Sequence, residues 1–198
     1  MNLDIKTVKG TEIEPYIPDI ARLRITIFRD FPYLYDGSTE YEQEYLNTYL
    51  RSPRSLAVLV MDGQNVVGVS TGIPLADETA EFQKPFTDRG FDPADIFYCG
   101  ESVLAQEYRG RGIYTTFFRE REQHARSFQQ FKSICFCAVT RPDDHPLRPE
   151  NYRPLDSVWQ SFGYQKEPGL TTLYSWKDVD QKLENEKKMV FWIKDLQD

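Results

Sequence analysis

Two spacings of apolar residues run through the first third of the chain and predict its elements. An alternating pattern predicts a strand over LDIKTV, residues 3–8. Apolar residues three and four positions apart then predict a helix that Pro32 ends, and a second helix over TEYEQEYLNTYL that Pro53 ends. A hairpin of two antiparallel strands follows, because SLAVLVM and VVGVSTG flank the Asp-Gly turn signal of DGQN.

The rest of the chain predicts a sheet built around apolar strands. Residues 76–95 are polar and rich in turn formers, which indicates a surface excursion with a short helix. The elements predicted after it are a strand over 96–104, a helix over 112–128, a strand over 131–140, a Pro-rich loop over 141–156, a short helix ending at Gly163, and two strands, LTTLYSWKDV and KKMVFWIKDL. The strand over 131–140 is apolar on both faces, so we expect it to be central. This order predicts a layered α/β fold with a mixed sheet.

Length, composition and charge limit the class of protein. With 198 residues, of which 40% are hydrophobic, the chain can bury one substantial core, and we expect a single domain over residues 1–198. The formal charge of -7 argues against nucleic acid as a partner, because nucleic-acid binding requires a concentrated basic face. No apolar run approaches the roughly 20 residues that span a bilayer, and the start has no signal-peptide core. We therefore expect a cytoplasmic protein without a membrane partner.

The cysteines and histidines do not form a metal-binding pattern. Three cysteines, an odd number, do not suggest a disulfide framework. Cys135 and Cys137 are two residues apart in a predicted strand and share one face, so we interpret them as buried thiols. No CxxC or HxxxH spacing joins them to His124 or His145. We expect no bound metal.

A glycine-rich turn, QEYRGRG, joins the strand over 96–104 to the long helix. The first turn of a helix presents free backbone N–H groups and the positive end of the helix dipole, which favours an anion in front of it. The turn lacks the GxxxxGK[ST] spacing of a P-loop and the third glycine of a GxGxxG dinucleotide-binding turn. A plain strand-to-helix turn with solvated arginines is the structural alternative.

Residues 107–112, EYRGRG, resemble the acetyl-CoA-binding motif of the GNAT superfamily of N-acetyltransferases, a strand followed by [Q/R]xxGx[G/A] and a helix. The predicted element order is also similar to that superfamily over most of the chain. The stretches LRITIFRDFPYLYDG, GESVLAQEYRGRGIY and RPDDHPLRPENYRPLD look like one bacterial branch of it. The resemblance implies a mixed, mostly antiparallel central sheet of about seven strands flanked by about four helices. It also implies direct transfer of an acetyl group from acetyl-CoA to the amine of a small molecule or peptide.

The resemblance also assigns residues to the acetyl-CoA site. Backbone groups near Leu104 and Ala105 would pair with the pantetheine arm, in a gap between the strands over 96–104 and 132–140. The backbone of residues 109–112 and the start of the helix would hold the pyrophosphate, because glycine lets the backbone approach the phosphates closely. The residues implied in cofactor binding are Leu104, Ala105, Arg109, Gly110, Arg111, Gly112, Tyr114 and Thr115. Glu107 and Tyr114 depart from the usual residues of the motif.

Acetyl transfer requires a base for the amine and an acid for the leaving thiolate. Glu101 is the candidate base, because it is the one carboxylate inside an otherwise apolar strand, where burial raises a carboxyl pKa. A structural ion pair of Glu101 with Arg24 or Arg29 is the alternative. The superfamily often places an acidic tyrosine four residues before the glycine of the short helix, and Trp159 stands there instead. Tyr152 is our predicted catalytic substitute.

Two alternatives to Tyr152 as the proton donor stay open. They are Tyr114, at the start of the long helix, and His145, in the Pro-rich loop. His145 also has a structural interpretation, as a loop residue satisfied by neighbouring aspartates.

The acceptor pocket is expected between the first two helices and the Pro-rich loop. The residues predicted to bind the acceptor are Arg24, Arg29, Tyr33, Tyr35 and His145. Arginines there would suit a carboxylate or phosphate of the substrate. The structural alternative is a solvated arginine face beside tyrosines at the edge of the core.

Two other functions and two assembly states stay open at this point. The functional alternatives are a catalytically silent acyl-CoA-binding or sensing domain and a protein-interaction domain of the same fold. The two last strands would pair within the chain or across a dimer, so the protein is expected to be a monomer or a homodimer.

Overall fold

Eight strands form one mixed sheet in this computed structural model, which describes residues 3–197. The strand order is β1-β2-β3-β4-β6-β8-β7, and β5 pairs with β3 beyond the end of β4. The strands are β1 (Leu3–Lys9), β2 (Leu56–Asp62), β3 (Asn65–Pro74), β4 (Ile96–Tyr98), β5 (Ser102–Leu104), β6 (Ser133–Val139), β7 (Gln165–Trp176) and β8 (Asn185–Asp195). The pairing of β4 with β6 is parallel and the other pairings are antiparallel, so the sheet is mostly antiparallel.

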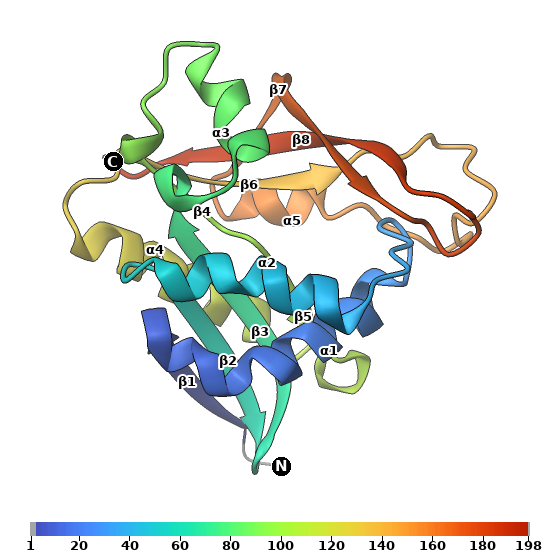
Figure 1. Cartoon of the computed structure of the whole chain (residues 1–198), viewed down its shortest axis with the longest axis horizontal. Coiled ribbons are helices and arrows are strands. Elements are labelled where there is room, and N and C mark those ends of the chain that lie inside the picture. Colours follow the sequence, from blue (N-terminus) through green and yellow to red (C-terminus); the bar gives the residue numbers. More distant parts are fainter. Residues whose placement is uncertain (1–2, 198) are drawn as a thin grey trace.

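Helices cover both faces of this sheet. The α-helices are α1 (Ile17–Phe28), α2 (Thr39–Arg51), α3 (Ala80–Thr87), α4 (Ile113–Ser127) and α5 (Asp156–Ser161). Short 3-10 helices are η1 (Gly10–Tyr16), η2 (Leu75–Asp77), η3 (Pro93–Asp95) and η4 (Gln106–Tyr108). Figure 1 shows α1 and α2 in front of β2 and β3, with α4 behind the same strands. Helix α3 shares a core with α1 and α2, and Trp159 of α5 packs into the core beneath α4.

Strand β6 divides the core, as its two apolar faces predict. It lies between β4 and β8. Cys135 and Cys137 point into the core under α1 to α3, whereas Ile134 and Phe136 point into the core under α4 and α5. All three cysteines are free and buried, which confirms the interpretation of Cys135 and Cys137 as buried thiols.

The pairings near both ends of the chain follow from local signals. The β2–β3 hairpin turns at Gly63, where the backbone has φ +61. The two last strands, β7 and β8, pair with each other within the chain. Strand β7 begins at Gln165, five residues before the predicted start, and reaches β8 across a register shift between Glu167 and Thr171.

None of the helices within residues 3–197 is long and apolar enough to span a membrane.

The prediction of one continuous strand over 96–104 was wrong in one respect, because the strand is interrupted. Its two ends are β4 and β5, and residues 99–101 lie outside both. This interruption accounts for the eighth strand. The short helix predicted within the polar excursion over residues 76–95 is confirmed as α3.

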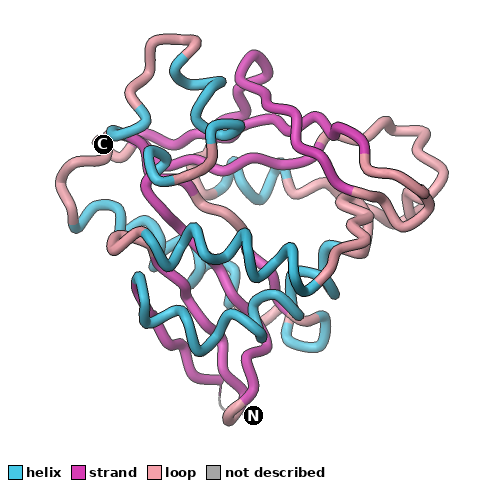
Figure 2. The backbone as a smooth tube through the Cα atoms, viewed as in Figure 1, coloured by secondary structure: helices cyan, strands magenta, loops and turns pink. Residues whose placement is uncertain are grey.

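Two long loops meet at one side of the sheet. Figure 2 shows the loop between α1 and α2 beside the loop that follows β6. Arg141 joins them, donating from Nε to the Pro32 carbonyl at 2.8 Å and from Nη2 to the Tyr33 carbonyl at 2.7 Å. The same guanidinium forms a buried ion pair with Asp178. These contacts hold the two loops together at the mouth of the pockets described below.

Candidate functional site

The centre of the sheet opens where β4 ends. Strand β4 pairs in parallel with β6 from Ile96 only as far as Tyr98, which lies opposite Cys135. The Cys99 N–H donates the last bond to the Cys135 carbonyl at 2.8 Å. Beyond this point β5 follows β3, while β6 stays with β8. The second half of β6 therefore has no strand partner on its β5 side among the described residues, and a gap separates the two strands.

Tight packing and a hydrogen-bond cluster cause this break. A Cβ at Gly100 would overlap the Tyr49 hydroxyl, so glycine is needed there. The Glu101 carbonyl accepts from Thr71 N at 3.1 Å and from Ser70 Oγ at 3.0 Å. These bonds hold residue 101 against β3 and away from β6.

The buried guanidinium of Arg121 supports the same segment from the α4 side. Arg121 is 2% exposed, and its Nη1 donates to Ser102 Oγ at 2.8 Å. Its Nε has no hydrogen-bond partner among residues 3–197. Backbone groups of alternate residues point to opposite edges of a strand. Because Ala105 N–H donates to Val67 of β3, the backbone groups of Leu104 point into the gap.

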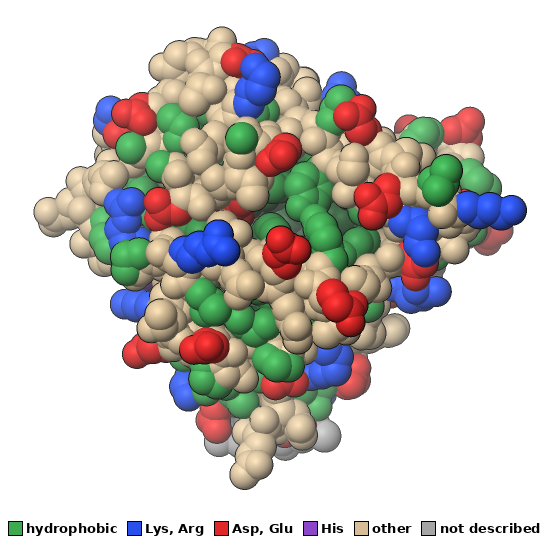
Figure 3. Space-filling model, viewed as in Figure 1, with side chains coloured by type: hydrophobic (Ala, Val, Ile, Leu, Met, Phe, Trp, Pro, Cys, Tyr) green, Lys and Arg blue, Asp and Glu red, His purple; other side chains and the backbone are tan. Residues whose placement is uncertain are grey.

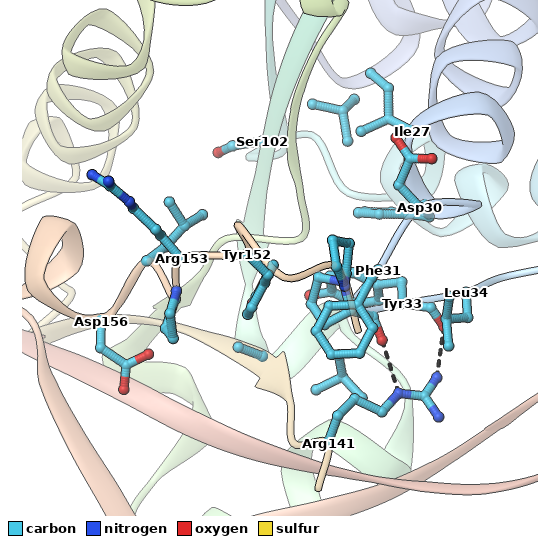
Figure 4. Close-up of a pocket in the computed structure, with 18 of the residues that line it drawn as sticks. Ile27, Asp30, Phe31, Tyr33, Leu34, Ser102, Arg141, Tyr152, Arg153 and Asp156 are labelled. Atoms are coloured by element: carbon cyan, nitrogen blue, oxygen red, sulfur yellow. Dashed lines mark hydrogen bonds between the residues drawn. The ribbon is translucent and has the colours of Figure 1, made fainter. Parts of the chain in front are cut away.

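A pocket of about 1300 Å³ occupies the gap and extends to the glycine turn and the two joined loops. Figure 4 shows Phe31 and Tyr33 of the α1–α2 loop on one side and Tyr152 of the opposite loop across from them, with Ser102 on a third side. The predicted residues that line it are Arg29, Tyr33, Leu104, Arg109, Gly110, Gly112, Tyr114 and Tyr152. The predicted residues that do not line it are Arg24, Tyr35, Glu101, Ala105, Arg111, Thr115 and His145.

The glycine turn forms an open cradle of N–H groups at one end of the pocket. Gly110 and Gly112 have φ +76 and +77, a conformation that favours glycine, and open space surrounds the Cβ position of each. Within the described chain, the N–H groups of Gly110, Arg111 and Gly112 have no acceptor. The N–H of Arg109 differs, because it donates to the Gln106 carbonyl at 3.2 Å. Free donors before α4 fit a phosphate or diphosphate.

A tyrosine and a tryptophan meet in the wall of this pocket. The Trp159 Nε1 donates to the Tyr114 hydroxyl at 3.1 Å. Because Tyr114 accepts this bond, its own hydroxyl hydrogen stays available for another acceptor. Burial raises the pKa of the Tyr114 phenol, and the hydrogen bond from Trp159 opposes that rise. The phenol of Tyr114 therefore lies beside the position at which the sequence lacks its expected tyrosine.

A second, smaller cavity of about 80 Å³ lies between α1, α2, α3 and β7. It shares Phe28 and Tyr33 with the large pocket, and Gly100 reaches it from the break after β4. Its tyrosines are Tyr33, Tyr35, Tyr41, Tyr45, Tyr98 and Tyr174. Figure 3 shows a hollow lined with hydrophobic side chains on this face of the molecule. We call the cavity of about 80 Å³ the tyrosine cavity.

Arg24 in the wall of the tyrosine cavity is held by two glutamates. Its Nε pairs with Glu42 and its Nη1 pairs with Glu101. Glu101, the candidate base, therefore forms the ion pair with Arg24 that was the structural alternative to a catalytic role. Burial raises the pKa of Glu101, although Arg24 acts in the opposite direction. Arg24 is consequently not free to bind a substrate carboxylate.

A third buried carboxylate, Glu78, adjoins the same cavity through two phenols. Its Oε1 accepts from Tyr49 at 3.4 Å and from Tyr45, which lines the cavity, at 3.5 Å. Burial raises the pKa of Glu78 to about 7. Sequence reasoning missed Glu78, because it stands in a polar run before α3 and no local pattern separates it from solvated acids.

The predicted acceptor residues Arg29 and His145 and the predicted catalytic residue Tyr152 each contact a neighbour in the two loops. Arg29 forms an exposed pair with Asp36 at 2.9 Å. His145 accepts from the Leu147 N–H at Nδ1, at 3.2 Å, rather than pairing with an aspartate. Tyr152 packs edge-on against Phe31, with ring centroids 4.6 Å apart. Residues 3–197 contain no group of three or more His, Cys, Asp or Glu side chains arranged to hold a metal ion.

Comparisons with known proteins agree in fold. No family model and no curated protein matches the sequence. Among solved structures, a protein of Desulfovibrio desulfuricans assigned to the GNAT family of acetyltransferases has a TM-score of 0.57 at 10% identity, over 98% of this chain and 99% of that one. An N-acetyltransferase of Staphylococcus aureus Mu50 has a TM-score of 0.60 at 12% identity, over 100% of each chain. NAA60 of Arabidopsis thaliana, solved with acetyl-CoA, has a TM-score of 0.61 at 11% identity, over 100% of each chain. The chain has the GNAT fold.

Proposed function

We propose that this GNAT-fold chain is an N-acetyltransferase that moves the acetyl group of acetyl-CoA directly to an amine. The observation that supports it is the gap between β5 and β6, which holds a pocket of about 1300 Å³ with the glycine cradle at one end and the tyrosine cavity at the other. One ligand in the gap and another in the tyrosine cavity would meet near Phe28 and Tyr33, which line both sites. This is the arrangement that direct transfer between two bound molecules requires.

The chain's own groups fit acetyl-CoA along the gap. Acetyl-CoA would supply the acyl group as a thioester. The free N–H groups of Gly110, Arg111 and Gly112 would bind its pyrophosphate, and the backbone of Leu104 would pair with the pantetheine amides. Arg109 supports that segment, because its Nε donates to the Leu104 carbonyl at 3.1 Å. A ligand here would replace the strand partner that β5 and β6 lack.

Proton transfer would use groups on both sides of the break. Removing a proton from an ammonium at neutral pH favours a base whose pKa lies near the working pH. Glu101 remains a candidate base, and Glu78 is a second one, connected to the cavity by the hydroxyls of Tyr45 and Tyr49. Tyr114 would donate the proton to the leaving thiolate, since its hydroxyl hydrogen is free. Tyr152 is the alternative donor from the opposite wall.

A second function has one observation in its favour. Trp159 occupies the position of the tyrosine that often protonates the thiolate in this superfamily, and indole donates no proton in this pH range. A chain without a working acid would bind acyl-CoA without turning it over. Acetyl-CoA binding with no transfer to any of a broad panel of amines would identify such a sensing domain.

The first experiment measures the thermal midpoint with and without acetyl-CoA. A ligand at 100 times its Kd stabilises the fold by about 2.7 kcal/mol. Gly112→Asp, which places a carboxylate at the cradle, should abolish this shift. Gly90→Asp is the matched control, because Gly90 has φ +79 and open space around its Cβ position but does not line the pocket. Absence of a shift in the wild type, or an equal loss in both variants, would contradict the acetyl-CoA site.

A further inference from the structure

Three buried carboxylates surround one guanidinium beside the tyrosine cavity. Glu42 is 0% exposed, Glu101 is 4% exposed and Glu78 is 5% exposed. Arg24 pairs with Glu42 and Glu101. Two other buried cations of this region, Arg141 and Lys187, pair with Asp178. A third, Arg121, donates to the Glu101 carbonyl and the Ser102 hydroxyl rather than to a carboxylate, and none of the three lines the cavity. The cavity therefore has fewer cations in its wall than it has carboxylates beside it.

The two glutamates that hold Arg24 each keep a free oxygen. Glu42 Oε1 and Glu101 Oε1 are buried and have no hydrogen-bond partner among the described residues. A buried carboxylate oxygen without a partner is costly, and proteins ordinarily pair such groups with a donor or a cation. Glu42 itself lines the cavity. An added ammonium group would provide both the missing charge and the missing donors.

The aromatic walls also favour a cation. Arg24 already lies over the Tyr45 ring at 4.5 Å and over the Phe28 ring at 5.2 Å, and both rings line the cavity. Aromatic faces attract cations through their quadrupole, most strongly where water is excluded. Figure 3 shows acidic side chains on several sides of the rim of the hollow. An anion approaching this face would meet negative charge at the rim and in the wall.

The cavity is large enough for one end of a small molecule only. Its volume of about 80 Å³ has room for an amino group with a few carbon atoms, and Tyr41 and Tyr174 bond to each other through their hydroxyls in its wall. The flat faces of these tyrosines suit a short alkyl or aromatic arm. A carboxylate next to the amine would be placed among Glu42, Glu101 and the phenols.

We infer that the acceptor is a monocationic primary amine on a short apolar or aromatic arm, with no carboxylate beside the amine. The inference rests on the proposed function, because it specifies the acceptor of that reaction. It also reverses the expectation that Arg24 selects an anionic metabolite. The tyrosine cavity selects positive charge.

Titration calorimetry with three matched ligands tests the charge preference. 2-Phenylethylamine, phenylalanine and 3-phenylpropionate present a cation, a zwitterion and an anion on closely similar skeletons. The protein should bind the amine at least about tenfold more tightly than either carboxylate. Equal or tighter binding of phenylalanine or 3-phenylpropionate would overturn the inference.

Two variants locate the binding in the tyrosine cavity. Glu42→Gln removes one charge from the wall and should weaken amine binding about tenfold or more, whereas Glu44→Gln, an exposed acid on the same helix, should leave it within about twofold. Tyr41→Ala removes a wall residue that is 42% exposed, so it tests the cavity even where Glu42→Gln fails to fold. Amine binding that neither folded variant weakens would place the amine elsewhere and overturn the inference.

Binding and turnover separate this inference from the proposed function. Amine binding that depends on the tyrosine cavity, without acetyl transfer, would support the cation site and contradict the proposed enzyme. Transfer of acetyl groups to acceptors other than primary monocations, with no binding of 2-phenylethylamine, would support the enzyme and overturn the cation site.

Discussion

The indole nitrogen of Trp159 lies 3.1 Å from the hydroxyl oxygen of Tyr114 and donates a hydrogen bond to it. The two residues come from α5 and α4, which are separated in the chain by β6. Trp159 is fixed in place by edge contacts with Phe136 and Trp192, whose ring centroids are each 5.0 Å from its own. The tryptophan thus takes the place of the expected tyrosine and orients another tyrosine in the same wall.

Tyr114→Phe should lower kcat for acetyl transfer by about 100-fold, because general acids contribute on the order of 10²–10⁴-fold. Acetyl-CoA binding should stay within about twofold of the wild type, since the ring is kept. Trp159→Phe removes the supporting hydrogen bond and part of the packed ring but keeps the Tyr114 hydroxyl, so it should lower kcat less than Tyr114→Phe does. Tyr108→Phe is the control, because its hydroxyl bonds to Asp62 at 2.8 Å outside the pocket. Steady-state kinetics provide the measurement. An unchanged kcat in Tyr114→Phe would contradict Tyr114 as the proton donor and would favour Tyr152.

Glu101→Gln should separate the base from the counterion. If Glu101 takes the proton of the amine, kcat of the folded variant falls by about 100-fold. The urea midpoint falls as well, because the substitution breaks the buried pair with Arg24. If Glu101 serves only as a partner of Arg24, kcat stays near the wild-type value. Parallel measurement of kcat and of the urea midpoint distinguishes these outcomes.

Glu78→Gln should change the pH dependence of stability. The folded pKa of about 7 lies above the ordinary value of 4.5, so the folded state holds the proton more tightly than the unfolded state. The contribution of the Glu78 proton to the free energy of unfolding is fully present below pH 4.5. It is lost as the pH rises to about 7, by about 3 kcal/mol in total. The variant should therefore match the wild type near pH 4.5 and exceed its free energy of unfolding at pH 8.

An exposed acid provides the control for Glu78. The Thr79 hydroxyl lowers the pKa of Glu81, so Glu81→Gln should change the pH dependence weakly and in the opposite direction. Urea titrations between pH 4.5 and pH 8 provide the comparison. A wild type and Glu78→Gln with parallel pH profiles would show that Glu78 titrates normally.

Arg141→Gln should destabilise the fold and open the pocket mouth. The guanidinium is 8% exposed and forms two bonds to Asp178, at 2.7 and 2.9 Å, besides its bonds to the α1–α2 loop. Breaking a buried pair on one side costs about 3–5 kcal/mol. The KM for acetyl-CoA should also rise, because the two loops line the same pocket.

The matched control for Arg141 is in the same loop. Arg148 pairs with Asp143, which is 98% exposed, and exposed pairs contribute about 0–1 kcal/mol. Arg148→Gln should therefore leave the unfolding midpoint nearly unchanged. Similar losses in both variants would mean that the loop junction does not depend on the buried pair.

Much of the fold follows from signals that act over a few residues. The apolar spacing of α2, the Asp-Gly turn of the β2–β3 hairpin and the two apolar faces of β6 each depend on local periodicity or on one backbone conformation. The same holds for the glycine turn, since Gly110 and Gly112 adopt the positive φ that glycine tolerates. Local patterns were therefore sufficient for the element order and for one end of the candidate site.

The tertiary structure decided which side chains act together. Arg24 meets Glu101 across 77 positions and Trp159 meets Tyr114 across 45, and no periodicity specifies such contacts. The break after Cys99 depends on how Tyr49 packs against Gly100, which a strand pattern does not record. The sequence by itself determined the elements and the glycine turn, because these are local; the tyrosine cavity and its charge balance arise only where the sheet order brings distant segments together.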